Sequence, residues 1–303
     1  MTPDPVFAAL LAAAPEGMVL RPPPLRARPA DLRPAPPALM SHLAGWRDLV
    51  ILDGSHQSAE FAPPLRQGWT DTWTVTVRRA KTLQNLRVSD LGWADVEGAD
   101  PMIVADWHPV RRARAGLEHM ASTGRYHAFS SLNERRLLIA LDFEGVHDVT
   151  SQPFTLTWRG ERSWRRHTPD FVVRTDAGVV LVNVRPSDLL DDQHHSSSAA
   201  AAAVALSRGW QFVVVAGYSR PALDVVEACA YDRHAPDRAG LAGELLALFD
   251  HGPLTFADAA DSTEAFGFNR QLLRAFVHDR LLTMDLNGGL SDSTVLRLPQ
   301  DPR

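Results

Sequence analysis

The segment that most restricts the possible folds is residues 130–186, in which one expected helix is followed by several expected strands. Its polar residues stand where these elements begin or end. Glu134 falls in the first turns of the helix, Asp170 precedes a strand, and Asn183 and Arg185 end another. We therefore expect these four side chains, distant in sequence, to meet on one edge of a sheet.

The helix that contains Glu134 is predicted to begin at Ser130 or Ser131, either of which can cap it. Three leucines follow Glu134 at spacings of three, four and seven residues, which places them on its helical face. These are Leu137, Leu138 and Leu141. A carboxylate among core leucines is costly unless it meets a cation or a hydrogen-bond donor, so Glu134 is a candidate site residue.

The remaining pattern predicts an α/β fold with a mixed sheet flanked by helices. Strands are expected at 149–159, with a break at Pro153, and at 170–174, 179–184 and 210–215, and helices are expected at 198–208 and 221–231. Strand alternation places Asn183 and Arg185 on one face of their strand, and we expect that face to meet the helix of Glu134. The alanine-rich helix 198–208 is suited to close packing on a sheet.

The four polar residues suggest a nuclease site. Two carboxylates and a basic group can hold a divalent cation, orient a water and neutralise a phosphodiester. We predict Glu134, Asp170 and Asn183 as metal ligands, although the amide of Asn183 adds no negative charge. Arg185 supplies fixed positive charge but no proton near neutral pH. Its alternative role is a surface ion pair, and Asp170 alone could be a turn residue.

Residues 158–167 contain four arginines with Trp158 and Trp164 interleaved, a pattern suited to following a DNA backbone. The alternative is a solvated hairpin with exposed arginines. The residues expected to contact DNA are Arg159, Arg162, Arg165, Arg166 and His167.

The charge of the chain is unevenly distributed. Residues 107–190 hold 12 Arg and no Lys against 9 Asp and Glu, whereas the whole chain has a formal net charge of -5, so a phosphate-binding surface is expected in the middle. The single cysteine, Cys229, is expected in the core and excludes a disulfide framework. His194 and His195 are expected in an exposed acidic loop. No secretion signal or membrane span is apparent, which favours a soluble cytoplasmic protein.

Composition changes suggest four parts: a Pro-rich arm (1–40), a small β-rich N-terminal unit (41–106), a core (107–235) and a C-terminal module (236–303). Helices near 241–250, 256–260 and 269–280 and a hairpin at 282–298 are typical of a winged helix. Arg270 and Arg274 on the third helix are candidate DNA contacts, with protein docking as the alternative.

The ordered motifs resemble the TnsA-like endonuclease subunits of heteromeric transposases, in the PD-(D/E)xK nuclease superfamily. The resemblance is carried by residues 129–134, 151–154, 167–171 and 182–186. It implies a restriction-endonuclease-like core that nicks DNA at a transposon end beside a partner transposase, with Mg²⁺, or Mn²⁺ in its place, as cofactor. It also implies Glu134 and Asp170 as acidic site residues, Asn183 as third ligand and Arg185 as the basic residue.

Asn183 and Arg185 depart from the commonest form of this motif, which has an acidic residue or Gln and then Lys. A second hypothesis is therefore a DNA-binding or scaffold subunit that keeps the nuclease fold without cutting. Glu134 favours the enzyme, because an inactive site would have little reason to keep a carboxylate among leucines.

Overall fold

The computed structural model describes residues 37–103, 114–160, 163–234, 238–262 and 269–300. Residues 1–36 of the expected arm, and Arg162, lie outside these ranges. Ala38–Arg303 form one compact unit. No described helix is long and apolar enough to cross a membrane.

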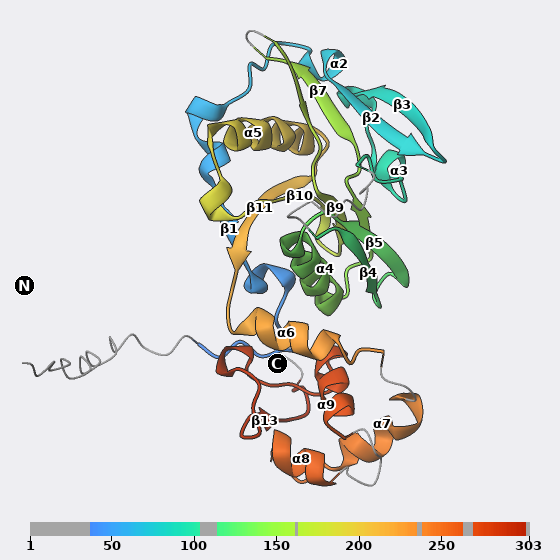
Figure 1. The fold of residues 1–303 in the computed structure, drawn as a ribbon, viewed down its shortest axis with the longest axis vertical. Coiled ribbons are helices and arrows are strands. Elements are labelled where there is room, and N and C mark those ends of the chain that lie inside the picture. The colour runs from blue at the N-terminus through green and yellow to red at the C-terminus, as the bar shows by residue number, and fades with distance from the viewer. Residues whose placement is uncertain (1–36, 104–113, 161–162, 235–237, 263–268, 301–303) are drawn as a thin grey trace, which may run out of the picture. The chain divides into compact units, whose positions relative to one another are not determined.

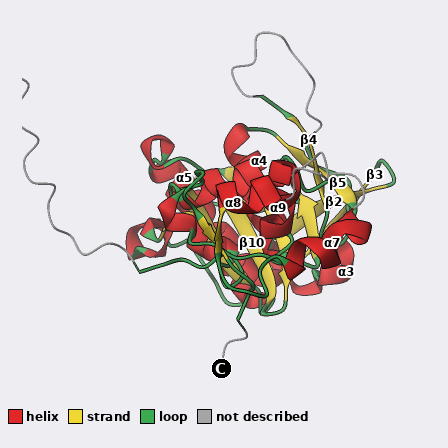
Figure 2. Ribbon diagram, turned by 90° about the horizontal axis from the view of Figure 1, so that it is seen from below, coloured by secondary structure: helices red, strands yellow, loops and turns green. Residues whose placement is uncertain are grey.

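A five-stranded mixed sheet lies at the centre of this unit, in the order β1-β11-β10-β9-β6 (Figure 1). The pair β10/β11 is parallel and the other neighbours are antiparallel. The strands, yellow among red helices in Figure 2, are β1 (Val50–Asp53), β6 (Asp148–Ser151), β9 (Phe171–Thr175), β10 (Gly178–Val184) and β11 (Gln211–Tyr218). This arrangement confirms the predicted α/β class.

Helices cover both faces of the sheet because its side chains are apolar on both. Helix α4 (Leu132–Glu144) and α6 (Ala222–Ala230) share one hydrophobic cluster with Val180 and Val182. On the other face, the alanines of α5 (Asp192–Ser207) pack with Val172 and Leu181, as the sequence predicted.

Strand β10 corrects one expectation about the site. Leu181 lies in the α5 cluster, and the next side chain on that face, Asn183, donates to Ser198 of α5. The expectation that this face meets the helix of Glu134 is therefore wrong. The buried leucines of α4 pack on the opposite, apolar face, while Glu134 at the start of α4 lines the same cavity as the polar residues.

A second sheet has four strands in the order β3-β2-β7-β8. These are β2 (Thr74–Arg79), β3 (Thr82–Arg87), β7 (Thr155–Arg159) and β8 (Trp164–His167). The expected β-rich N-terminal unit does contain strands, but β1 pairs with β11 and β2 with β7. Residues 41–106 thus contribute strands to both sheets, and the domain boundaries inferred from composition stay predictions.

Smaller elements complete the part before residue 130. A hairpin of β4 (Gly116–Met120) and β5 (Arg125–Phe129) packs against α4. The short helices there are η1 (Trp46–Leu49), η2 (Ser55–Gln57), η3 (Ala59–Phe61), α2 (Trp69–Thr72), η4 (Val88–Asp90) and α3 (Trp93–Val96). A further short helix, η5 (Ser187–Leu189), lies between β10 and α5.

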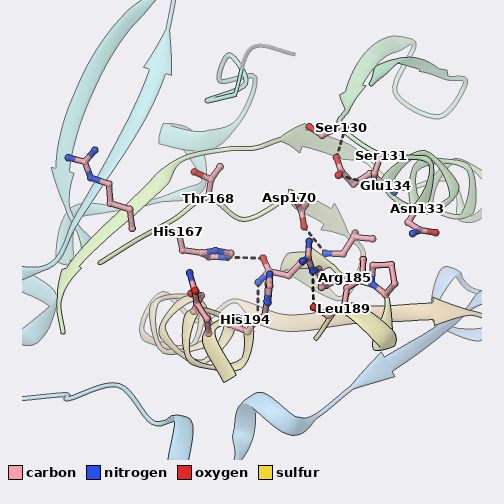
Figure 3. Close-up of a pocket in the computed structure, with 17 residues that line it drawn as sticks. Ser130, Ser131, Asn133, Glu134, His167, Thr168, Asp170, Arg185, Leu189 and His194 are labelled. Carbon is pink, nitrogen blue, oxygen red and sulfur yellow. Dashed lines mark hydrogen bonds between the residues drawn. The ribbon is translucent and has the colours of Figure 1, made fainter. Parts of the chain in front are cut away.

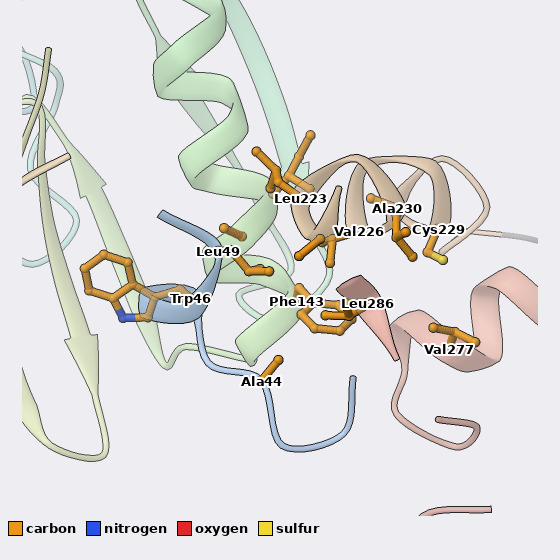
Figure 4. Packing of buried hydrophobic residues seen from close by; sticks show 14 of the residues in the cluster. Ala44, Trp46, Leu49, Phe143, Leu223, Val226, Cys229, Ala230, Val277 and Leu286 are labelled. Atoms are coloured by element: carbon orange, nitrogen blue, oxygen red, sulfur yellow. The ribbon is translucent and has the colours of Figure 1, made fainter. Parts of the chain in front are cut away.

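The C-terminal segment contains the three predicted helices, α7 (Arg238–Ala247), α8 (Phe256–Ser262) and α9 (Asn269–His278). The predicted hairpin is reduced to a bridge between Thr283 and Arg297, and β13 (Val295–Leu296) pairs instead with β12 (Leu254–Thr255). Helix α9 packs on α6. Cys229 is buried there, as expected, near Phe143, Val277 and Leu286 of the η7 turn (Leu286–Gly288) (Figure 4).

Candidate nuclease site

A cavity of about 540 Å³ lies at the end of β10 (Figure 3). Its wall comes from the start of α4, the end of β8, the segment that leads into β9, the end of β10 and the first turns of α5. All four predicted catalytic residues line it: Glu134, Asp170, Asn183 and Arg185. The structure therefore brings together side chains separated by up to fifty-one positions in the sequence.

Glu134 is held by the start of its own helix. Ser131 is the N-cap residue, whose Oγ accepts from Glu134 N at 3.2 Å and donates to Glu134 Oε1 at 3.0 Å. The N–H of Ser130 donates to Oε2 at 2.7 Å. Burial raises the pKa of Glu134, and the Ser130 and Ser131 hydrogen bonds oppose this. The carboxylate is thus fixed at the rim of the cavity.

Asp170 links the start of β9 to the end of β10. Its Oδ2 accepts from the backbone N–H of Val184 at 2.7 Å, and its own N–H donates to the carbonyl of Val182 at 3.1 Å. Burial raises the pKa of Asp170 to about 8, the carboxylate of Glu134 adds to this, and the Val184 N–H and Arg185 oppose it. The two acidic groups therefore act on each other electrostatically.

Asn183 is buried, and both ends of its amide have partners. Oδ1 lies 3.1 Å from Nε2 of His167, and Nδ2 donates to Ser198 Oγ at 3.0 Å. Burial lowers the pKa of His167 to about 4; the Asn183 contact opposes this and His194 adds to it. A neutral His167 thus faces the amide oxygen that the sequence predicted as a metal ligand.

Arg185 is half-buried at the mouth of the cavity. Its Nε donates to the carbonyl of Leu189 at 3.2 Å, and it has no ion pair with any carboxylate in the described ranges. Its alternative role, a surface ion pair, is not what the structure shows. The rest of its guanidinium remains available to a ligand.

Helix α5 adds residues that the sequence analysis missed. It begins at Asp192, earlier than the expected 198, because Asp191 caps it by accepting from His194 N at 2.9 Å. His194 therefore lies in a helix and lines the cavity, whereas an exposed loop was expected; Gln193, Ser197 and Ser198 join it. Asp191, three residues before His194, is the sequence signal that could have located the start of α5.

The residues expected to contact DNA separate into two groups. Arg166 and His167 line the cavity, and Arg159 and Arg165 are exposed on the β7–β8 hairpin next to it. Arg270 and Arg274 belong to α9, do not line the cavity, and pair with Asp292 and Asp232.

The oxygen donors of the cavity fit a hard divalent cation. Such ions bind carboxylate and amide oxygens, and a cation would offset the burial that raises the pKa of both Glu134 and Asp170, as well as the repulsion that Glu134 adds at Asp170. Within the described ranges there is no group of three or more His, Cys, Asp and Glu side chains placed to hold a metal ion. The predicted ligands that line the cavity are two carboxylates and the Asn183 amide.

Comparison with protein families supports the resemblance stated from the sequence. Residues 144–217 match the family described as TnsA-like endonuclease N terminal. The matched range runs from β6 to β11 and includes Asp170, Asn183 and Arg185, while Glu134 precedes it. No curated protein matches the chain. The resemblance to TnsA-like endonucleases is thus confirmed for this segment.

Proposed function

We propose that this protein is a metal-dependent DNA endonuclease subunit of a transposition system, which nicks DNA at transposon ends together with a partner transposase. The observation that carries the proposal is the cavity that gathers Glu134, Asp170 and Arg185. The match of residues 144–217 to TnsA-like endonucleases supports the same reaction class.

The cavity combines acidic and basic side chains. Glu134 and Asp170 contribute acidic groups, whereas Arg166 and Arg185 contribute positive charge and His194 a further polar group. A phosphodiester bound in this cavity would have its charge neutralised by the arginines. Acidic and basic groups in one cavity are what hydrolysis of a phosphate ester requires.

Glu134 and Asp170 would hold Mg²⁺, or Mn²⁺ in its place, with the amide oxygen of Asn183 as a third donor. When bound, the ion would polarise the phosphate and make a water more acidic. Asp170 must lose its proton to take part, while the Val184 N–H orients its carboxylate. Arg185 would add positive charge as its fork contacts the phosphate, and it keeps its proton throughout.

One set of contacts bears on the non-cutting hypothesis. The oxygen of Asn183 already contacts His167, and both oxygens of Glu134 accept hydrogen bonds from the N-cap of α4. Each oxygen keeps a further lone pair, so these contacts are compatible with metal binding as well as with a purely structural site.

We further propose that residues 236–303 act as a winged-helix-like module that docks a partner protein. The order α7, β12, α8, α9 and β13 follows that architecture. Protein docking is favoured over DNA contact because Arg270 and Arg274 are paired with carboxylates and most of α9 is buried against the core.

The test of the main proposal is nicking of a plasmid that carries a transposon end, with the partner transposase and Mg²⁺ or Mn²⁺. We expect wild type to nick and Asp170→Ala to be inactive. Asp176→Ala is the matched control, since Asp176 is exposed, lies outside the cavity and loses only a contact with His147.

Thermal unfolding must show that each variant folds. Equal nicking by wild type and Asp170→Ala would sink the endonuclease assignment. If none of the proteins nicks but wild type binds the end DNA, the non-cutting hypothesis takes its place.

A further inference from the structure

The four-stranded sheet has one buried face and one open face. Val75, Val77, Leu156 and Trp158 on the inner face are buried in the α5 cluster. The alternate side chains point the other way, and all of them are at least partly exposed. We call this set the Thr–Arg face: Thr74, Thr76, Arg78, Leu83, Asn85, Arg87, Thr155, Thr157, Arg159, Trp164 and Arg166.

The strand register arranges these side chains in rows across the sheet. Arg87 lies opposite Thr74, Thr74 opposite Thr157, and Thr157 opposite Arg166. In the next row Asn85 lies opposite Thr76 and Thr76 opposite Thr155. Thr76 donates to Asn85 at 2.7 Å, and Thr155 contacts Thr168 at 2.8 Å. Each row thus ends next to β8.

The charge of this sheet is of one sign. None of its four strands contains Asp or Glu, and together they hold six arginines in a chain whose net charge is -5. The nearest acid by pairing is Asp100, whose backbone bridges to Arg78. Because no other carboxylate is built into these rows, the face attracts anions.

The arginines of the Thr–Arg face also lack the ion pairs found elsewhere. No described carboxylate pairs with Arg87, Arg159 or Arg166, and Arg159 instead lies over the ring of Trp164 at 5.8 Å. Several arginines on other surfaces are paired with acids; examples are Arg125, Arg136, Arg220 and Arg270. Unpaired guanidinium groups beside hydroxyls are donors that lack an anionic acceptor.

The Thr–Arg face is continuous with the nuclease cavity. Arg166 belongs to both, and Thr168, one residue beyond β8, lines the cavity while its hydroxyl contacts Thr155. A phosphate backbone held in the cavity can therefore continue onto the sheet. Figure 1 shows β2, β3 and β7 lying together beyond β10, on the side of α5.

We propose that the Thr–Arg face binds the phosphate backbone of duplex DNA beside the cleaved position, which rests on the proposed function. Guanidinium, hydroxyl and amide groups are the donors that contact phosphates. Trp164 is the one aromatic side chain in the set, so stacking of single-stranded bases is not favoured. Four strands span about 15 Å, or roughly four phosphates along one DNA strand.

Binding of the full-length protein to a fluorescein-labelled duplex of arbitrary sequence tests this, by anisotropy without divalent metal over a range of salt concentrations. Arg87→Gln should weaken binding roughly eightfold at about 0.1 M salt and lower the slope of log K against log salt by about 0.9. Arg47→Gln is the matched control, because this substitution removes the same charge from an exposed residue. Arg47 donates to Gln211 at the start of β11.

Asn85→Lys provides a gain of function that misfolding cannot mimic, since it should tighten binding and raise the slope by about 0.9. Unchanged affinity and slope in Arg87→Gln and Asn85→Lys would overturn the proposal, as would absence of duplex binding by wild type at low salt. The nicking assay reports separately on the proposed function. If wild type nicks DNA while Arg87→Gln binds the duplex as tightly as wild type, DNA binding by the Thr–Arg face is refuted and the proposed function is not.

Discussion

The amide oxygen of Asn183 lies 3.1 Å from Nε2 of His167 inside the candidate nuclease site. Burial lowers the pKa of His167 to about 4, so its ring is neutral at pH 7. An amide oxygen only accepts, which requires the proton of the neutral ring to reside on Nε2 in this arrangement. His167 thus positions the side chain that the proposed function uses as the third ligand.

Asn183→Asp should change both partners of this contact. A carboxylate in place of the amide should raise the pKa of His167 by about one to three pH units, because it favours the charged imidazolium. It should also tighten Mn²⁺ binding by adding a negatively charged donor. NMR titration of His167 and calorimetry with Mn²⁺ measure the two effects. An unmoved His167 titration would show that the two side chains are not in contact.

Asp170→Asn should stabilise the metal-free protein at neutral to alkaline pH. The pKa of Asp170 is raised to about 8 by burial and by Glu134, so the folded state holds its proton more tightly than the unfolded chain does. The stability this provides is complete below about pH 4 and is lost as pH rises through about 8. Asn keeps the acceptor for Val184 N–H without the charge.

Urea unfolding in EDTA at pH 5 and pH 8 tests this. At pH 8 we expect the free energy of unfolding of Asp170→Asn to exceed that of wild type by about 1–3 kcal/mol, and at pH 5 we expect a smaller difference. Asp176→Asn is the exposed control. If wild type and Asp170→Asn lost equal stability between the two pH values, the raised pKa of Asp170 would be refuted.

The sequence was sufficient to predict the elements around the site where local signals agreed. Glu134 at the start of an apolar helix and the apolar run 179–184 required only helical and strand periodicity. The start of α5 was misjudged because residues 192–197 are polar and show no apolar periodicity, so only the cap at Asp191 marks it.

Tertiary packing decided what local signals could not. Alternation places Asn183 with Leu181, but which helix covers that face depends on how α4 and α5 pack. The pairing of β2 with β7 joins strands about eighty residues apart, and no local pattern encodes such a partner. For this reason the contribution of residues 41–106 to a surface next to the cavity emerged only from the structure.

Arg185→Gln should lower nicking about 10²- to 10³-fold, the usual cost of removing one donor to a reacting oxyanion. Arg185→Lys should recover part of this at neutral pH and lose activity at alkaline pH, because Lys titrates there and Arg does not. The pH dependence of the nicking rate under single-turnover conditions measures the difference. A flat alkaline profile in Arg185→Lys would argue against a role for charge at residue 185.

Arg233→Met should destabilise the fold strongly. The buried guanidinium of Arg233 pairs with Glu118 at 2.6 Å and with Asp142 at 3.3 Å, which joins β4 and α4 to the segment after α6. Its removal leaves the buried carboxylate of Asp142 without an arginine and leaves Glu118 with Arg135 as its remaining arginine, and it should cost about 3–5 kcal/mol. Arg220→Met, which breaks the exposed pair with Asp224, should cost at most about 1 kcal/mol. Equal urea midpoints for the two variants would contradict this distinction.

His127→Gln should make the protein more resistant to acid. Burial, with the nearby charge of Arg125, lowers the pKa of His127 to about 4, while Nε2 contacts Thr123 Oγ1 at 2.7 Å. The unfolded chain takes up this proton near pH 6.5 and the folded state only near pH 4. The stability linked to His127 is therefore complete above about pH 6.5 and is lost as pH falls toward 4. Urea unfolding between pH 7 and pH 4.5 should show wild type losing about 1–3 kcal/mol more than His127→Gln. His147→Gln changes an exposed histidine and is the control, which should lose stability with acid as wild type does. Equal losses of stability in wild type and His127→Gln would assign the acid sensitivity to another group.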